Sequence, residues 1–144
     1  MNEMYHYAVK LLARRDYTAA ELRTKIEKKF GAFDESVIAE LTKRKFLDDR
    51  RFVRNFAAKK ARHSREYLEE QLQQRGVDRQ IVAEELGKAE RPSLRDVLNA
   101  TMVDWKLRAP LNPRDAARLF RALGRLGYPE DAIREVLEPF HEQQ

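Results

Sequence analysis

Apolar residues recur at helical spacing along the chain, and the recurrence itself repeats with a long period. Three segments open with an N-cap residue, whose side-chain oxygen can accept a hydrogen bond from a first-turn amide. These caps are Thr18, Ser64 and Asn112. An apolar pair four residues apart follows each cap, so both of its members lie on one face of a helix. The pairs are Leu22 and Ile26, Leu68 and Leu72, and Leu119 and Leu123.

Further signals predict two more helices in each repeat. A glycine follows each apolar pair, at the left-handed position that ends many helices. These glycines are Gly31, Gly76 and Gly127. A second helix start comes directly after each glycine, at Asp34, Asp78 and Pro129. Amphipathic segments precede the caps, over residues 5–14, 50–62 and 94–106.

The pattern predicts an all-α protein, built as an elongated stack of three tandem three-helix repeats. The repeats cover residues 1–46, 47–92 and 93–144 of one continuous, solenoid-like chain. A unit of about 45 residues buries too little apolar surface to be stable alone, so each repeat is expected to gain stability from its neighbours. The composition favours helices as well, because Ala and Leu far outnumber Val, Ile and Thr combined.

The composition also limits the compartment and the chemistry. The 144 residues include no Cys, which excludes disulfides, thiolate zinc sites and a cysteine nucleophile. No apolar run approaches the roughly 20 residues that a membrane helix needs, and the N-terminal sequence lacks the features of a signal peptide. We therefore expect a cytoplasmic protein without a membrane partner, acting as a monomer.

The titratable residues do not form a catalytic or metal-binding pattern. The three histidines, His6, His63 and His141, are isolated in sequence and are interpreted as surface residues. Asp48 and Asp49 directly precede a predicted helix, whose positive end they would stabilise. The acidic pairs at 69–70 and 84–85 are interpreted as solvated helix faces. The sequence thus predicts no catalytic residue, no cofactor and no metal, and a protein that is not an enzyme.

Positive charge is concentrated in the first two repeats. The chain has 29 basic and 24 acidic residues, a formal charge of +5. The densest run contains no acidic residue and consists of Arg50, Arg51, Arg54, Lys59, Lys60, Arg62 and Arg65. At 100° per residue, four of its arginines, including Arg62, share about one third of a helix circumference. Smaller sets that can extend this surface are Arg14 with Arg15, and Arg23 with Lys25, Lys28 and Lys29.

The basic run predicts a surface for an anionic partner, and the alternative is an exposed face that only increases solubility. Aromatic residues near it lie at core spacing, so stacking on nucleic-acid bases is not predicted. These residues are Phe30, Phe52, Phe56 and Trp105. A helix-turn-helix interpretation of the three-helix unit stays open, although no helix combines short polar base readers with flanking phosphate contacts.

Several segments resemble the RecX family of bacterial recombination regulators. They are AVKLLARRDYTAAELRTKI at 8–26, KFLDDRRFVRNF at 45–56, YLEEQLQQRGV at 67–77 and RLFRALGRLGYPEDAIREVL at 118–137. The most specific block is the apolar-Leu-Asp-Asp-x-Arg-Phe run from Phe46 to Phe52. The resemblance extends over nearly the whole chain.

The resemblance implies a modulator of homologous recombination and DNA repair. Members bind the RecA recombinase filament on single-stranded DNA and restrain its ATP hydrolysis, strand exchange and coprotease activity. The basic residues named above would then contact the filament, and direct binding to single-stranded DNA is expected to be weak and salt-sensitive. The alternative is a helical protein that binds DNA directly, without a recombinase partner.

Overall fold

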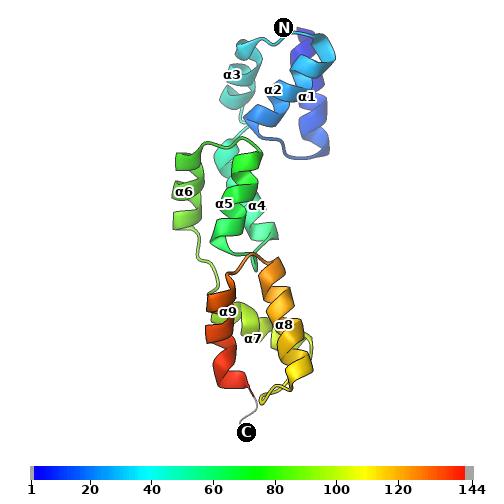
Figure 1. The fold of residues 1–144 in the computed structure, drawn as a ribbon. Coiled ribbons are helices and arrows are strands. Elements are labelled where there is room, and N and C mark those ends of the chain that lie inside the picture. The colour runs from blue at the N-terminus through cyan, green and yellow to red at the C-terminus, as the bar shows by residue number, and fades with distance from the viewer. Residues whose placement is uncertain (1, 142–144) are drawn as a thin grey trace. The chain divides into compact units, whose positions relative to one another are not determined.

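The computed structural model describes residues 2–141 and confirms the all-α prediction. Residues 2–141 contain nine α-helices and one short 3₁₀ helix, and they contain no β-strand (Figure 1). The α-helices are α1 (Asn2–Arg14), α2 (Ala19–Phe30), α3 (Glu35–Lys43), α4 (Asp49–Lys59), α5 (Arg65–Gln74), α6 (Arg79–Lys88), α7 (Leu94–Asp104), α8 (Pro113–Arg125) and α9 (Glu130–Leu137), followed by η1 (Glu138–Phe140).

The contacts within the chain divide it into two compact units. The first unit contains the residues up to Lys59 together with Glu69–Ala89, and the second contains Lys60–Leu68 together with the residues from Glu90 onward. The chain passes between the units after Lys59, within α5 after Leu68, and after Ala89. The division into three repeats at 46/47 and 92/93 stays a prediction.

Helices α1, α2 and α3 surround one apolar core in the first unit. Helix α1 packs against both α2 and α3, and α4 packs against α6 (Figure 1). The core is formed by Ala8, Tyr17, Leu22, Ile26, Val37, Ile38, Leu41 and Leu47. The predicted pair Leu22 and Ile26 is fully buried, as the spacing of four residues on one helix face requires.

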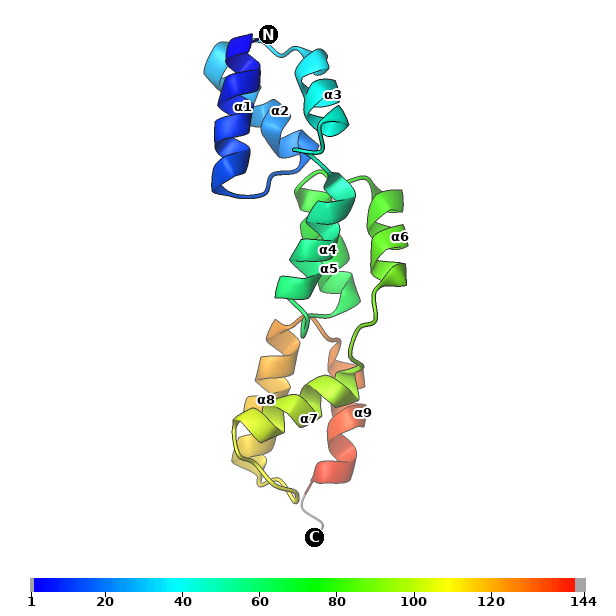
Figure 2. The ribbon, with the colours of Figure 1, turned by 180° about the vertical axis from the view of Figure 1, so that it is seen from behind.

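The second unit has its own core between α7, α8 and α9. Helix α7 crosses α8 and α9, and each of the three helices packs against the other two (Figure 2). The core is formed by Val97, Leu98, Met102, Leu111, Ala116, Leu119, Leu123, Ile133 and Leu137. The half-buried Trp105 and Phe120 pack against it.

The predicted caps begin the helices as expected. Thr18 Oγ1 accepts the Glu21 N–H at 3.1 Å, and the Glu21 side chain accepts the Thr18 N–H at 3.0 Å, which completes a capping box. Asn112 Oδ1 accepts the Asp115 N–H at 2.8 Å ahead of Pro113. Each bond satisfies a first-turn amide that has no partner within the helix.

The Thr18 cap also joins α2 to the connection between α5 and α6. The buried Thr18 hydroxyl donates to the Arg75 carbonyl at 2.7 Å. The next residue, Gly76, has a φ of 83°, and a Cβ atom added there would overlap the Cβ of Ala20. Only glycine combines this backbone conformation with so close an approach.

A similar junction joins α5 to the end of α8 in the second unit. The buried Ser64 hydroxyl accepts the Tyr67 N–H at 3.1 Å and donates to the Gly127 carbonyl at 3.0 Å. The Ser64 N–H donates to the Leu126 carbonyl at 2.8 Å. A residue far along the chain therefore fixes where α5 begins.

Two predicted helix ends are wrong. The expected helix over 50–62 ends at Lys59, and residues 60–62 form a turn in which the His63 N–H donates to the Lys60 carbonyl at 3.1 Å. Helix α4 cannot continue, because Ser64 is held as the cap of α5. Likewise α7 ends at Asp104 rather than at 106, since Lys106 adopts a φ of 58°.

None of the helices within residues 2–141 combines the length and apolar character that crossing a bilayer needs.

Candidate partner-binding surface

The arginines of α4 face the acidic residues of α6. Arg50 Nη1 lies 2.8 Å from Glu84 Oε2 and 3.1 Å from Glu85 Oε2. Arg54, one turn later, places Nη1 2.8 Å from Glu85 Oε1. Two of the predicted partner-binding residues therefore already form ion pairs within the first unit, although 42% and 54% of their side-chain surfaces remain exposed.

Glu85 is the centre of this cluster. Its residue surface is only 4% exposed, so the prediction of a solvated face at 84–85 is wrong for Glu85. The Arg54 guanidinium lowers the pKa of Glu85 to about 2; burial opposes this effect, while Arg50 and Lys88 add to it. A buried carboxylate is stable here because three cations surround it.

Arg51 binds the backbone instead of an acidic residue. Its guanidinium donates to the carbonyls of Lys45 at 3.0 Å and Phe46 at 3.3 Å, in the connection between α3 and α4. Lys45 has a φ of 63°, which is uncommon for a residue with a side chain. Arg51 therefore stabilises this connection, and no acidic side chain within residues 2–141 forms an ion pair with it.

Three more of the predicted cations have partners inside their own unit. Arg23 pairs with Glu35 at 2.7 Å in the first unit, and Arg62 pairs with Asp104 at 2.7 Å in the second. The Arg15 guanidinium lies 3.7 Å from the centre of the Tyr17 ring. Because Arg62 follows the end of α4, the prediction that it lies on the same helix face as Arg50 is wrong.

The remaining predicted residues are divided between the units. Lys59 is exposed at the end of α4 in the first unit. Lys60 is half-buried in the following turn and Arg65 is exposed at the start of α5, both in the second unit. The predicted set is therefore not a single patch on α4.

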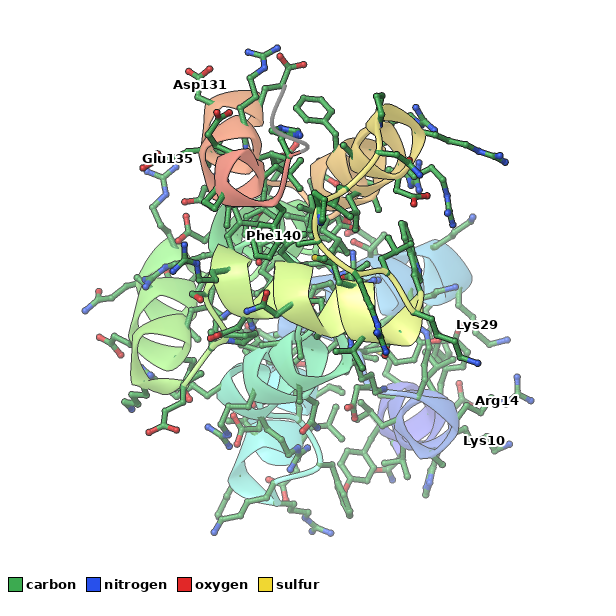
Figure 3. All side chains as sticks on the ribbon, turned by 90° about the horizontal axis from the view of Figure 1, so that it is seen from below. Lys10, Arg14, Lys29, Asp131, Glu135 and Phe140 are labelled. Atoms are coloured by element: carbon green, nitrogen blue, oxygen red, sulfur yellow. The ribbon has the colours of Figure 1, made fainter. Side chains whose placement is uncertain are left out.

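Arg14 and Lys25 belong to a surface that we call the α1–α2 basic face. It is formed by Lys10, Arg14, Lys25 and Lys29. Among the described residues, no acidic side chain forms an ion pair with any of the four. Lys29 crosses to α1, where its Nζ lies 5.1 Å from the centre of the Tyr7 ring. The side chains of Lys10, Arg14 and Lys29 point outward on one side of the first unit (Figure 3).

Sequence reasoning missed two features of these surfaces. Lys10 lies one helical turn before Arg14, and this spacing of four residues was available in the sequence. Four exposed arginines of α8 were also missed, because residues 93–144 have equal numbers of basic and acidic side chains. These arginines are Arg114, Arg118, Arg121 and Arg125.

The run from Phe46 to Phe52, the most specific part of the family resemblance, stabilises the fold. Leu47 and Phe52 are buried. Asp48 Oδ1 accepts the Arg51 N–H at 3.1 Å and so caps α4. Asp49 Oδ1 accepts the Ala19 N–H at 2.9 Å at the start of α2, and burial raises the pKa of Asp49. The two carboxylates therefore act at two helix N-termini, where their charge is favourable.

No described part of the chain brings together a metal-binding group of His, Cys, Asp or Glu side chains. His63 is half-buried rather than a solvated surface residue. The centre of its ring lies 4.5 Å from the centre of the Tyr67 ring, and its Nδ1 is buried without a hydrogen-bond partner. Burial lowers the pKa of His63, and the nearby charges of Lys60 and Arg91 lower it further.

Comparison with known proteins finds relatives along most of the chain. A protein named Regulatory protein RecX from Chromobacterium violaceum is 33% identical over 136 residues, which cover 90% of this chain and 86% of that protein. The protein of the same name from Thermus thermophilus is 35% identical over 130 residues, covering 89% and 85%. That from Trichlorobacter lovleyi is 30% identical over 149 residues, covering 95% of each. No protein-family model matches the chain.

Proposed function

Because this chain belongs to the RecX family of regulatory proteins, we propose that it binds the RecA recombinase filament on single-stranded DNA and inhibits its ATPase, strand-exchange and coprotease activities. The observation that carries the proposal is the similarity to regulatory proteins along about nine tenths of the chain. The role is regulation by occupancy, without a chemical step. It would act in the cytoplasm.

The α1–α2 basic face is the primary contact surface in this proposal. Its four cations have no acidic partner among the described residues, so a partner's carboxylates or phosphates need not displace an existing ion pair. Lys59 is exposed at the end of α4 in the same unit and can add to it. Long-range attraction between such a face and an anionic assembly accelerates association and weakens as salt rises.

The ion-paired arginines contribute less. An anionic partner must compete with Glu84 and Glu85 for Arg50 and Arg54, and with Asp104 for Arg62. The Arg62–Asp104 pair is exposed and contributes only about 0–1 kcal/mol, so Arg62 can rearrange. Arg50 and Arg54 are held more firmly, because moving them away would leave the buried Glu85 carboxylate without its cations.

Inhibition requires that the protein prefers one state of the filament. A bound protein shifts an equilibrium only by the difference between its affinities for the two states. We propose that it binds the resting filament more tightly than the conformations passed during ATP hydrolysis and strand exchange. Occupancy then slows turnover without any catalytic group.

A recombinase ATPase assay on single-stranded DNA tests the proposal. Wild-type protein should reduce the rate of ATP hydrolysis, and the Arg14→Glu/Lys25→Glu variant should need a higher concentration for the same effect. The matched control is Lys43→Glu/Arg79→Glu, which reverses two exposed charges on α3 and α6 of the same unit. An unchanged ATPase rate at saturating wild-type protein would refute the function; equal loss in both variants would refute the assignment to the α1–α2 basic face.

A further inference from the structure

The four arginines of α8 lie on one face of that helix. They follow one another at spacings of four, three and four residues, which places them within an arc of about 60°. All four are exposed. Ala116, Leu119 and Leu123 lie on the opposite side and are buried in the core. Nitrogen-tipped side chains project from α8 on the side away from α9 (Figure 3). We call this surface the α8 arginine stripe.

Most of the stripe's charge is not offset within the second unit. Asp115 is the acidic residue of α8, and it makes a 3.4 Å contact with Arg118. Arg118 also lies 4.6 Å from the centre of the Trp105 ring. Among the described residues, the other three arginines have no ion-pair partner. The acidic residues Asp131 and Glu135 of α9 point away from α8 (Figure 3).

Small residues flank the stripe. Helical spacing places Ala117 and Gly124 along one edge and Ala122 along the other. A Cβ atom added at Gly124 would meet no atom within 4 Å, so internal packing does not require a glycine there. The side chains beside the arginines are therefore short, and the backbone of a partner can approach the helix closely.

We propose that the α8 arginine stripe binds the sugar–phosphate backbone of a nucleic acid. All four cations are arginines, whose planar fork matches a phosphate group with two donors. The stripe is about 16 Å long at 1.5 Å per residue, and about five phosphates of one strand occupy that length at 3.4 Å each. A helix of this width also fits the major groove of a duplex. The inference does not depend on a recombinase partner.

An acidic protein surface is the competing partner, and the linear spacing favours the nucleic acid. Phosphates repeat regularly along a strand, as the arginines do along α8. Carboxylates on a folded protein form such a line only where one helix carries them at matching spacing, whereas every nucleic-acid strand has one. Contacts from the four arginines to phosphates carry no sequence information, so binding through them should depend on charge and length rather than sequence.

Fluorescence anisotropy with labelled oligothymidine and a labelled mixed-sequence duplex tests the inference, using the full chain without recombinase. The Arg121→Ala/Arg125→Ala variant keeps good helix formers in α8, and far-UV circular dichroism verifies its helix content. Each lost phosphate contact weakens single-strand binding about fivefold near 0.1 M salt, so the variant should bind about 25-fold more weakly. The slope of log affinity against log salt should decrease by about 1.4 on the single strand and about 1.8 on the duplex.

The matched control removes two exposed arginines elsewhere in the second unit, Arg95 of α7 and Arg134 of α9. The Arg95→Ala/Arg134→Ala variant should retain the wild-type salt slope. Equal weakening by both variants would overturn the proposal, because net charge and not the stripe would then decide affinity. Unchanged DNA binding by the Arg121→Ala/Arg125→Ala variant would also overturn it. If a parallel titration against DNA-free recombinase then shows weaker binding by that variant, the stripe binds an acidic protein surface instead. A loss on either DNA probe supports the proposal and identifies which form the stripe binds.

Discussion

Gly76 offers a direct test of how α2 contacts the connection between α5 and α6. Its φ of 83° is left-handed, and a Cβ atom there would overlap the Cβ of Ala20. Substitution Gly76→Ala should therefore incur two costs. Left-handed strain costs about 1–2 kcal/mol for a residue with a Cβ. Relieving the overlap in a packed junction costs about 1–3 kcal/mol more.

Two further variants separate these costs. Gly31 has a φ of 73° and nothing within 4 Å of an added Cβ, so Gly31→Ala should cost only the strain, about 1–2 kcal/mol. Ala20→Gly removes the overlapping atom and leaves the Ala20 Cα 3.9 Å from the added Cβ, an ordinary contact. In that background, Gly76→Ala should lose its overlap cost and retain its strain. Ala20→Gly alone should cost about 1 kcal/mol, as glycine does within a helix.

Urea unfolding followed by far-UV circular dichroism gives the free energy of unfolding for each variant. The double-mutant cycle between Ala20 and Gly76 should yield a coupling of about 1–3 kcal/mol, the overlap cost. A coupling near zero would refute the reasoning, because the two residues would then not be in contact. A Gly31→Ala cost equal to that of Gly76→Ala would refute it as well.

Three further predictions concern stability. Ser64→Ala should lower the free energy of unfolding by more than Ser93→Ala does, because Ser64 is both a cap and a hydrogen-bond donor to Gly127. Ser93→Ala removes only a cap, worth about 1 kcal/mol. Urea unfolding compares the two variants, and equal losses would contradict the Ser64–Gly127 bond. His63 has a lowered pKa when folded, so the unfolded chain binds the proton more readily, and stability should fall as pH decreases below about 6.5; the fall should shrink in His63→Gln. Glu85 should add stability above pH 4.5 that is lost as pH falls toward 2; acid titration of Glu85→Gln should lack this loss.

Features set by neighbouring residues were predictable from the sequence. The Thr18 capping box depends on Glu21, three residues later, and the Asn112 cap depends on the turn that follows it. The buried pair Leu22 and Ile26 follows from helical periodicity alone. Local chemistry decides these elements, so a single sequence is enough to place them.

Features set by distant residues were not predictable. The end of α4 depends on Ser64, whose position is fixed by Leu126. The helical spacing that continues to Arg62 therefore predicted a helix that is too long. The buried state of Glu85 depends on Arg50 and Arg54, more than 30 residues earlier in the chain. A count of charges cannot show such pairing, because it contains no information on which side chains meet.

The α8 arginine stripe is an intermediate case. Its spacing is present in the sequence, but averaging charge over residues 93–144 cancelled the arginines of α8 against acidic residues elsewhere. A search for single-sign charge at helical spacing would have found it. Charge therefore needs to be followed along each helix face rather than summed over a segment.

Recognition of a recombinase assembled on DNA is the core of the proposed function. A titration of the labelled protein against recombinase-coated single-stranded DNA, bare single-stranded DNA and DNA-free recombinase tests it most directly. We predict the tightest binding to the coated DNA, with an affinity that falls as salt rises. Binding to bare DNA that equals or exceeds binding to the coated strand would contradict the claim and favour a DNA-binding protein without a recombinase partner.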